Sequence, residues 1–335
     1  MAKRRTRRRP RRSAHTRPTG LQTLVFALVG LCLALGLYVS VGSGVGAAPT
    51  WQQIYAAFGL AADPLPAAEL PPQADAVHFI DVGQADATLL QSGGEYCLID
   101  AGDIDSEQAL LGYLEQLGVT RLKLLVMTHP HADHIGSMAQ VLQNLQVEQV
   151  LLPDFSKAPY PTTRLFEQVM TAVEQSGAAV YTAAPGQSYR LGAAGDLAVL
   201  AAGVQTDNYN DLSPVLRFTS GELSVLLSGD GEKPVEQAAL EQGAAVSAAV
   251  FKAAHHGSNT SNTQAFLQAV QPRYVVVSCG LGNSYGHPHS EPMQRFAQLG
   301  AQVLRTDQSG SVVIAATNAG LQSYTASAAK QKEAA

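Results

Sequence analysis

Charged residues are scarce in this sequence, and those present are unevenly distributed. Only 15% of the 335 residues are Asp, Glu, Lys or Arg, whereas 46% are hydrophobic, so the chain buries a large core in one or two domains. The first twenty residues contain nine Lys or Arg residues and no acid, which leaves a net charge of about -14 (-5 minus 9) for the rest of the chain at pH 7. A globular part this acidic does not attract nucleic acids through its overall charge.

Cysteine is also rare, and it does not define the compartment. Cys32 lies in an apolar stretch, while Cys97 and Cys279 end strand-like runs, where small buried thiols are common. The alternative is a disulfide between Cys97 and Cys279 in an oxidising exterior. No internal repeat is evident along the chain.

Charge is absent altogether from Leu21 to Val41. About twenty apolar residues at ~1.5 Å rise each span the hydrocarbon core, so we predict a transmembrane helix over 21–41. The basic head, 1–20, then stays in the cytoplasm, and everything after Val41 lies outside a bacterial cytoplasmic membrane. A cleavable signal peptide is the alternative, because Val45-Gly46-Ala47 offers a cleavage site, and cleavage would release a secreted protein.

The composition changes again after the apolar stretch. Residues 42–75 are rich in Ala, Pro and Gly and are typical of a linker. Trp51, Ile54, Tyr55 and Phe58 are spaced so that a short helix gathers them on one side, which either rests on the membrane surface or latches onto the globular part. We expect the globular domain at 76–325 and a short tail at 326–335.

Strand-like and helix-like runs are intermixed through the expected globular domain. Short apolar runs predict strands over 77–80, 88–90, 96–99, 124–127, 150–152, 215–218, 225–227, 274–277 and 312–314. Helical periodicity predicts helices over 107–117, 135–145, 163–176, 234–242, 264–270 and 292–299. This order predicts an α/β fold in which helices cover the sheets.

Histidine and aspartate are concentrated in one short segment, Thr128-His129-Pro130-His131-Ala132-Asp133-His134, directly after the apolar run 124–127. Three imidazoles and a carboxylate in one strand-end loop converge on metal from several directions without a long span of chain. The histidine pair separated by one residue serves one ion, and the adjacent Asp-His pair serves a second. A chance cluster or a purely structural zinc loop is the alternative.

This segment resembles the His-x-His-x-Asp-His signature of the metallo-β-lactamase-fold hydrolases. Within that superfamily, 77–315 resembles the extracytoplasmic hydrolase domain of ComEC-type competence proteins. The other matching segments are FIDVGQADA (79–87), LSGD (227–230), KAAHHGS (252–258), GHPH (286–289) and RTDQSG (305–310). The resemblance implies a four-layered αββα sandwich. Because the chain lacks the many membrane helices of a full competence channel, it looks like a stand-alone version with its own anchor.

The resemblance also implies a metal centre. The expected ligands are His129, His131, Asp133, His134, Asp230 and His256, with Asp230 bridging two ions. Adjacent strand residues point to opposite faces, so one of His255 and His256 is expected to bind metal while the other orients it or contacts substrate; we favour His256 as the ligand. By the same resemblance, Asp81 is expected to accept a hydrogen bond from a metal-bound histidine or from the loop, and Asp86 to assist it. A capping or turn role is the alternative for Asp86.

Further roles are expected around this centre. The expected catalytic residues are Asp133, His255 and His287, and the expected substrate-binding residues are Asn210, Ser258, Asn283, Tyr285 and His289. A loop that carries imidazoles after the strand 274–277 suits substrate binding or proton donation to a leaving group. An ordinary hydrogen-bonded loop is the alternative.

Histidine is missing from one stretch where the superfamily commonly uses it. No histidine occurs from Ile135 to Ala254, where many of these hydrolases supply another metal ligand, and the chain offers Asn210-Asp211-Leu212-Ser213 instead. The first ion is therefore expected to have fewer protein ligands, which leaves room for water or substrate or weakens its binding. We expect Zn²⁺, as two ions, with Mn²⁺ as the alternative.

A two-metal centre suits hydrolysis of a phosphodiester, because the attacking and leaving oxygens are both held. The ComEC resemblance implies DNA as the substrate, with any contact made by a local patch such as Lys252, Arg217 and Arg273. The first alternative is a zinc hydrolase of a carboxylic ester, lactone, thioester or lactam. The second is a non-catalytic module that binds a partner at the cell envelope.

Overall fold

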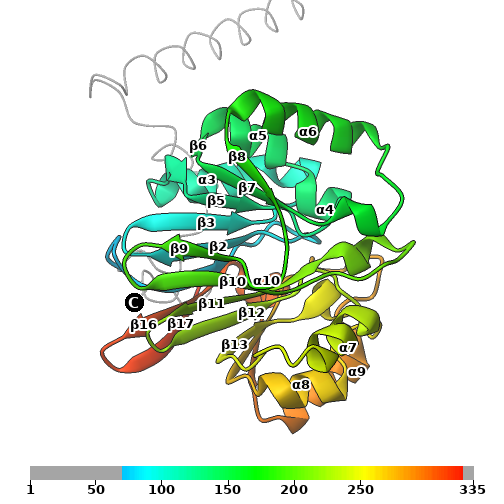
Figure 1. The fold of residues 1–335 in the computed structure, drawn as a ribbon. Helices are drawn as coiled ribbons and strands as arrows, with labels where there is room; N and C mark the ends of the chain where they lie inside the picture. The colour runs from blue at the N-terminus through cyan, green and yellow to red at the C-terminus, as the bar shows by residue number, and fades with distance from the viewer. Residues whose placement is uncertain (1–69, 327–335) are drawn as a thin grey trace, which may run out of the picture. The chain divides into compact units, whose positions relative to one another are not determined.

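The computed structural model describes residues 70–326, which lie in the compact unit that begins at Asp63. The predicted transmembrane helix, most of the predicted linker and most of the tail lie outside these residues. Among the described residues, no helix has the length and apolarity needed to cross a bilayer. The described part is built from two β-sheets and the helices that flank them (Figure 1).

The first sheet has eight strands and comes mainly from the amino-terminal half. Their order is β17 (Gly320–Thr325), β16 (Val312–Thr317), β1 (Ala76–Phe79), β2 (Thr88–Ser92), β3 (Glu95–Ile99), β5 (Leu124–Val126), β7 (Gln149–Leu152) and β8 (Ala179–Thr182). Strands β3, β5, β7 and β8 are parallel to one another. Helices α3 (Glu107–Gln116), α5 (Met138–Asn144) and α6 (Arg164–Ser176) cover the outer face.

The second sheet has seven strands. Their order is β15 (Gln302–Arg305), β14 (Tyr274–Val277), β13 (Val250–Lys252), β12 (Leu223–Leu227), β11 (Pro214–Ser220), β10 (Gly195–Ala202) and β9 (Ser188–Leu191). Helices α7 (Lys233–Glu241), α8 (Gln264–Val270) and α9 (Ser290–Gln298) pack on its outer face. Two short strands, β4 (Arg121–Leu122) and β6 (Gln146–Val147), pair separately.

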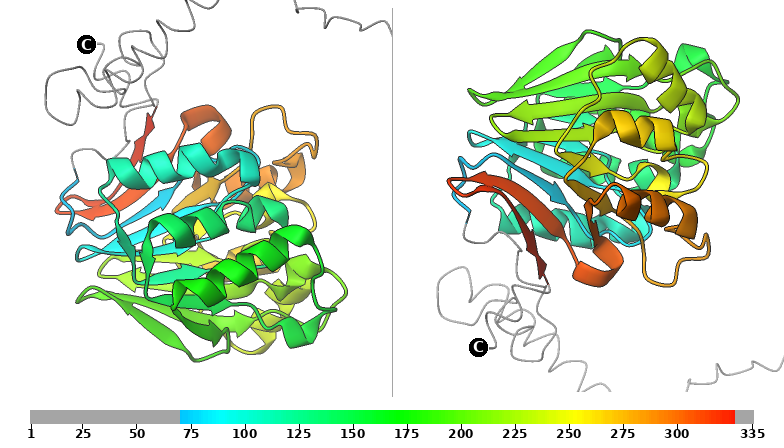
Figure 2. Two further views of the ribbon diagram at one scale, coloured as in Figure 1. Left: turned by 90° about the horizontal axis from the view of Figure 1, so that it is seen from above. Right: turned by 90° about the horizontal axis from the view of Figure 1, so that it is seen from below.

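Three hydrophobic cores separate four layers of structure. Alternation along the strands produces them, because successive side chains point to opposite faces. In β14, for example, Val276 packs between the sheets, while Val275 and Val277 pack against the outer helices. A third core lies between the first sheet and α3, α5 and α6. The views from above and below show a helical layer outside each sheet, which confirms the expected αββα arrangement (Figure 2).

The predicted elements agree with the structure where the hydrophobic pattern is strong. The predictions over 264–270 and 274–277 match α8 and β14 to the residue. Strands β8, β9 and β10 were not predicted. Strand β8 has a short apolar segment but is exposed along its whole length at the edge of its sheet, and β9 is also an edge strand, so neither has the buried apolar pattern of a central strand. Cys97 and Cys279 are buried and free, so the disulfide alternative is wrong.

Candidate metal centre

The histidine-rich loop begins just after β5. His131 lies at the amino end of the short helix α4 (Ala132–Ile135), and the turn brings His131 Nδ1 to 3.0 Å from His129 Nε2. Helix α4 carries Asp133 and His134 into the same centre, where Asp133 Oδ2 lies 3.9 Å from His134 Nε2. The loop and the first residues of α4 therefore bring four potential metal-binding side chains together within residues 129–134.

Asp230 lies among imidazoles from both sheets. It follows β12, and its Oδ1 is 3.3 Å from His134 Nε2. Its Oδ2 is 4.0 Å from His129 Nε2 and 3.7 Å from Nε2 of both His255 and His256. Gly229 permits this approach: it has φ +49°, and a Cβ there would lie 2.8 Å from the Thr128 side chain. A carboxylate with imidazoles around both oxygens has the position that a ligand shared by two cations needs.

The paired histidines adopt an unusual backbone conformation. They lie beyond β13 in a short 3-10 turn (Ala254–Gly257), with φ/ψ of 51/50° at His255 and 53/26° at His256. These are left-handed conformations that residues other than glycine rarely adopt. The strand alternation expected for the pair is therefore wrong, because neither residue is in the strand. The turn directs both Nε2 atoms towards Asp230.

The donor set fits a divalent cation. His134 Nε2 and Asp230 Oδ1 are buried, and neither has a hydrogen-bond partner within the described part of the chain. Such atoms cost free energy unless something satisfies them. Ligand atoms of Asp86, His134, Asp230 and His256 lie within 4.8 Å of one another, and Asp133 Oδ2 lies 3.2 Å from His256 Nε2.

Within that group, Asp86 has a different position from the others. The ring nitrogen of His256 that approaches it is Nδ1, at 3.6 Å, whereas Nε2 faces Asp133 and Asp230. Asp86 also forms a 2.5 Å ion pair with Lys252. Asp86 thus lies on the Nδ1 side of the imidazole, whereas Asp133, His134, Asp230 and His256 face one another and are the candidate ligands of the second ion.

The electrostatics favour positive charge at the centre. Burial alone would raise the pKa of Asp230, but the neighbouring imidazoles of His134, His256 and His129 outweigh it and hold that pKa well below its usual range. Burial likewise opposes protonation of His134, but Asp230 and Asp100 outweigh it and raise the pKa of His134 well above its ordinary value. Carboxylates surround this position and stabilise a cation there.

Two residues that contact the Nδ1 atoms of the expected ligands were not predicted. Asp100 accepts a 2.7 Å hydrogen bond from His134 Nδ1, and its two oxygens also accept from the backbone N and Oγ1 of Thr128. The hydroxyl of Ser213 lies 3.5 Å from His129 Nδ1 and accepts from Asp230 N. Asp100 ends β3 beside the loop, so its place at a strand terminus was the available signal. Asp81, expected in such a role, accepts from Gly83 N through its carboxylate.

A cleft of about 370 Å³ opens onto the centre. Its lining includes Gln84, His131, Asp133, Asn210, Asp230, His255, His256, Tyr285 and His287. His287 stacks on Tyr285 and on His256, with ring centroids 5.7 and 6.0 Å apart. Burial, followed by the charges of His256 and His255, lowers the pKa of His287 to about 4, so this ring is neutral at pH 7.

The other expected substrate-binding residues lie around the cleft rather than in its lining. Asn283 uses its amide to bond Gly280 O, His287 O and His287 N, which holds the loop in shape. His289 Nδ1 accepts from Asn259 N, and Ser258 is buried with its hydroxyl 3.1 Å from Thr260 Oγ1. Lys252 is only 2% exposed and is paired with Asp86, so its expected contact with nucleic acid is wrong.

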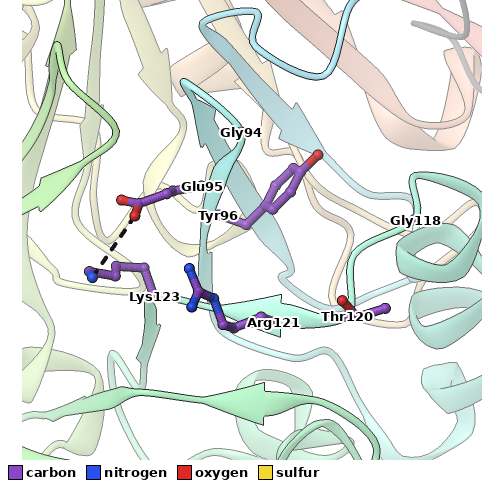
Figure 3. A pocket seen from close by; sticks show the side chains of 7 residues that line it. All are labelled: Gly94, Glu95, Tyr96, Gly118, Thr120, Arg121 and Lys123. Carbon is purple, nitrogen blue, oxygen red and sulfur yellow. Dashed lines mark ion pairs between the residues drawn. The ribbon is translucent and has the colours of Figure 1, made fainter.

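A smaller pocket of about 190 Å³ lies at the opposite end of β3 and β5 (Figure 3). Glu95 begins β3 and Lys123 precedes β5, and their side chains are 3.9 Å apart. Arg121 and Lys123 both pair with Glu148, at 3.1 and 2.9 Å. The charges in this pocket are therefore neutralised by one another at the surface.

Comparisons with known proteins agree with this arrangement. The family model described as the metallo-beta-lactamase superfamily matches residues 80–281. ComE operon protein 3 of Bacillus subtilis is 29% identical over 255 residues, which cover 70% of this chain and 32% of that protein. Competence protein ComA of Neisseria gonorrhoeae is 28% identical over 252 residues, covering 72% and 32%. The chain spans about a third of the length of these relatives.

Solved structures also match part of the chain. The crystal structure of the metallo-beta-lactamase fold protein YhfI from Bacillus subtilis has a TM-score of 0.46 and 13% identity, and the match covers 69% of this chain and 96% of that one. The family model covers well over half of the chain, including the histidine-rich loop, Asp230 and the paired histidines. The chain therefore belongs to the metallo-beta-lactamase superfamily and is related within it to the ComEC-type competence proteins.

Proposed function

We propose that this protein is an extracytoplasmic, metal-dependent phosphodiesterase that acts on DNA. The observation that carries the proposal is the position of Asp230, with four imidazole nitrogens within 4.0 Å of its carboxylate and an open cleft beside it. Metal ions bound by these residues would supply Lewis acidity at the cleft. A phosphodiester suits such a centre because it carries negative charge from the outset.

The chain's own residues then have separate tasks. His129, His131, Asp133, His134, Asp230 and His256 would hold the ions. Asp100 accepts from His134 Nδ1 and the Ser278 carbonyl oxygen accepts from His256 Nδ1, so each ring is fixed with Nε2 towards the centre. His287 is neutral and half-buried at the cleft, and it is placed to donate a hydrogen bond to the leaving oxygen.

DNA as the substrate is supported by the rim of the cleft and by the related proteins. Tyr285 is 67% exposed and stacks on His287, so one face of an aromatic pair is available to a base. The two curated relatives are named for competence or its operon. Because the globular part is acidic, binding depends on the metal ions and on short-range stacking rather than on long-range attraction.

The decisive experiment tests a small phosphodiester, single-stranded DNA and a lactam as substrates of one preparation of the full chain. We expect hydrolysis of a generic phosphodiester, bis(4-nitrophenyl) phosphate, and degradation of linear single-stranded DNA. EDTA should abolish both activities, Zn²⁺ or Mn²⁺ should restore them, and Asp133→Ala and Asp230→Ala should lack them. Turnover of a chromogenic lactam without turnover of the phosphodiester would instead favour the acyl hydrolase. Folded protein that binds no metal and hydrolyses neither substrate would favour the binding module.

The location of the enzyme is part of the same proposal. The charge-free stretch 21–41 would anchor the protein in the cytoplasmic membrane with residues 76–325 outside. Membrane fractionation of cells expressing the full chain, followed by protease treatment of intact spheroplasts, tests this. Release of the globular part into the medium would favour cleavage, and protection from protease would contradict the proposed orientation.

A further inference from the structure

The first metal site has fewer assigned ligands than the second. The second ion has Asp133, His134, His256 and the shared Asp230, whereas His129 and His131 are the only ligands assigned to the first ion besides Asp230. The described part of the chain has no histidine between Ile135 and Ala254 to add to them. Two imidazoles and a shared carboxylate give the first ion three protein ligands, one fewer than the second ion has.

The ring of His255 is oriented as a metal ligand would be, with Nε2 towards Asp230. Its Nε2 lies 3.7 Å from Asp230 Oδ2, the same distance as the Nε2 of His256. The same carboxylate oxygen lies 4.0 Å from His129 Nε2, and His255 and His131 both line the cleft. His129, His255 and His256 therefore all approach Oδ2 of the shared carboxylate, while His134 approaches Oδ1 at 3.3 Å. Of the two paired rings, it is His256 that also approaches Asp133, at 3.2 Å.

The other ring nitrogen of His255, Nδ1, has polar partners of the kind that usually orient metal-binding imidazoles. Its Nδ1 is 3.1 Å from Thr260 Oγ1 and 3.5 Å from Glu232 Oε1. Glu232 is itself fixed, because its backbone N donates to Asp211 Oδ1 and its Oε1 accepts from Asn210 Nδ2. A carboxylate or hydroxyl behind the ring fixes both tautomer and orientation.

The backbone gives an independent indication. A left-handed conformation is unfavourable at a residue other than glycine, and here His255 and His256 adopt it consecutively. An extended backbone would direct the two rings to opposite faces. The left-handed turn is what brings both Nε2 atoms to Asp230, so its strain is accounted for if both rings bind metal.

We infer that His255 is the third histidine ligand of the first ion and takes the place of the histidine missing between residues 135 and 254. This inference rests on the proposed two-metal function and refines it. Glu232 and Thr260 are positioning residues in this arrangement. His255 and His256 then serve different ions although they are adjacent in the chain.

Metal content, measured on the purified full chain with limiting Zn²⁺, tests the assignment. Asparagine tolerates left-handed backbone, so His255→Asn and His256→Asn remove a ring with little disturbance of the turn. We expect two ions in the wild type and one in His255→Asn, with binding of the lost ion weakened by more than the roughly ten- to hundredfold that loss of a partner behind a ligand costs. Asn259→Ala, an exposed asparagine in the next loop, is the matched control and should keep both ions.

Double variants assign each histidine to its ion. His131→Ala combined with His255→Asn should lose no more metal than His131→Ala alone, because both changes act on the first site. His255→Asn combined with His256→Asn should lose both ions. Two ions at wild-type affinity in His255→Asn would overturn the inference, as would a His255/His256 double variant no worse than His256→Asn. If the metal pattern is as expected but no phosphodiester is cleaved, only the proposed function fails.

Discussion

The two ends of β3 and β5 carry similar amounts of charge and differ in how that charge is arranged. At the amino end, Glu95 and Lys123 meet Arg121 and Glu148 in ion pairs on the surface. At the carboxyl end, the same strands lead to Asp100 and His129, which are buried. The first group is neutralised by its own side chains, whereas the second contains buried atoms, such as Asp230 Oδ1, that have no hydrogen-bond partner among residues 70–326.

This difference in burial indicates which end of the strands is suited to bind a ligand. A surface ion pair contributes about 0–1 kcal/mol to the free energy of unfolding. It needs no bound ion, because water screens any remaining charge. Buried carboxylates and imidazoles have no such screening, so their cost persists unless a bound cation offsets it. The carboxyl end is therefore suited to bind metal, and the pocket at the amino end is explained as surface structure (Figure 3).

The largest expected effect comes from removing the shared carboxylate. Asp230→Ala should lower phosphodiester hydrolysis by about a thousandfold or more, because loss of a single preorganised charge-stabilising group already costs ~10²–10³ and both ions depend on Asp230. Glu95→Ala removes a carboxylate from the other end and should leave the rate within about twofold. The activity is measured as kcat/KM at saturating Zn²⁺. Comparable losses of activity in the two variants would show that the carboxyl end of the strands is no more important for hydrolysis than the amino end.

The next effect compares two lysine ion pairs by their burial. Lys252 and Asp86 have side chains only 3% exposed, whereas Lys123 and Glu148 are 30% and 26% exposed. Lys252→Met leaves a buried carboxylate unpaired and should lower the free energy of unfolding by about 3–5 kcal/mol. Lys123→Met should change it by no more than about 1 kcal/mol. Urea denaturation of both variants gives the comparison, and the double variant Asp86→Asn/Lys252→Met should recover part of the loss.

A smaller effect is expected behind the second ion. Asp100→Ala removes the acceptor for His134 Nδ1 and should weaken binding of that ion by about ten- to a hundredfold. Asp105→Ala, an exposed aspartate in the next loop, is the matched control and should bind metal as the wild type does. Equal affinities in both variants, measured by competition with a zinc chelator, would mean that Asp100 has no part in orienting the ligand.

The smallest effect concerns a buried histidine with a full set of partners. His78 Nε2 faces Gln91 Oε1 at 3.0 Å and Nδ1 faces the Tyr113 hydroxyl at 2.9 Å, and burial lowers the pKa of His78 to about 4. Between pH 6.5 and 4 the unfolded chain binds a proton there that the folded chain does not, so stability falls as pH falls. From pH 6.5 to 5 this amounts to about 1–2 kcal/mol.

His78→Gln keeps polar groups that can bond Gln91 and Tyr113 but does not titrate in this range. Its free energy of unfolding should therefore depend less steeply on pH between 6.5 and 5 than that of the wild type. Urea unfolding at a series of pH values measures both slopes. Parallel curves would show that His78 is not the group responsible.

Local patterns in the sequence were enough to predict much of the fold. Strands buried on both faces, such as β14 and β5, are continuous apolar runs, and amphipathic helices such as α6 follow the helical period closely. Strand β8 could not be predicted in this way, because an exposed edge strand needs no apolar run and is defined by pairing with β7. Its hydrogen bonds depend on a partner about 30 residues away in the chain.

The chemistry of the site is determined partly by the sequence and partly by the tertiary structure. By itself, the segment from His129 to His134 determined that the protein has a metal-binding loop, because its ligands are close together in the chain. Only the tertiary structure decided which groups face it: Asp100 behind His134, Lys252 paired with Asp86 instead of exposed, and both His255 and His256 turned towards Asp230. Side-chain direction outside regular strands depends on backbone dihedrals and packing partners from distant segments, and residue spacing does not specify these.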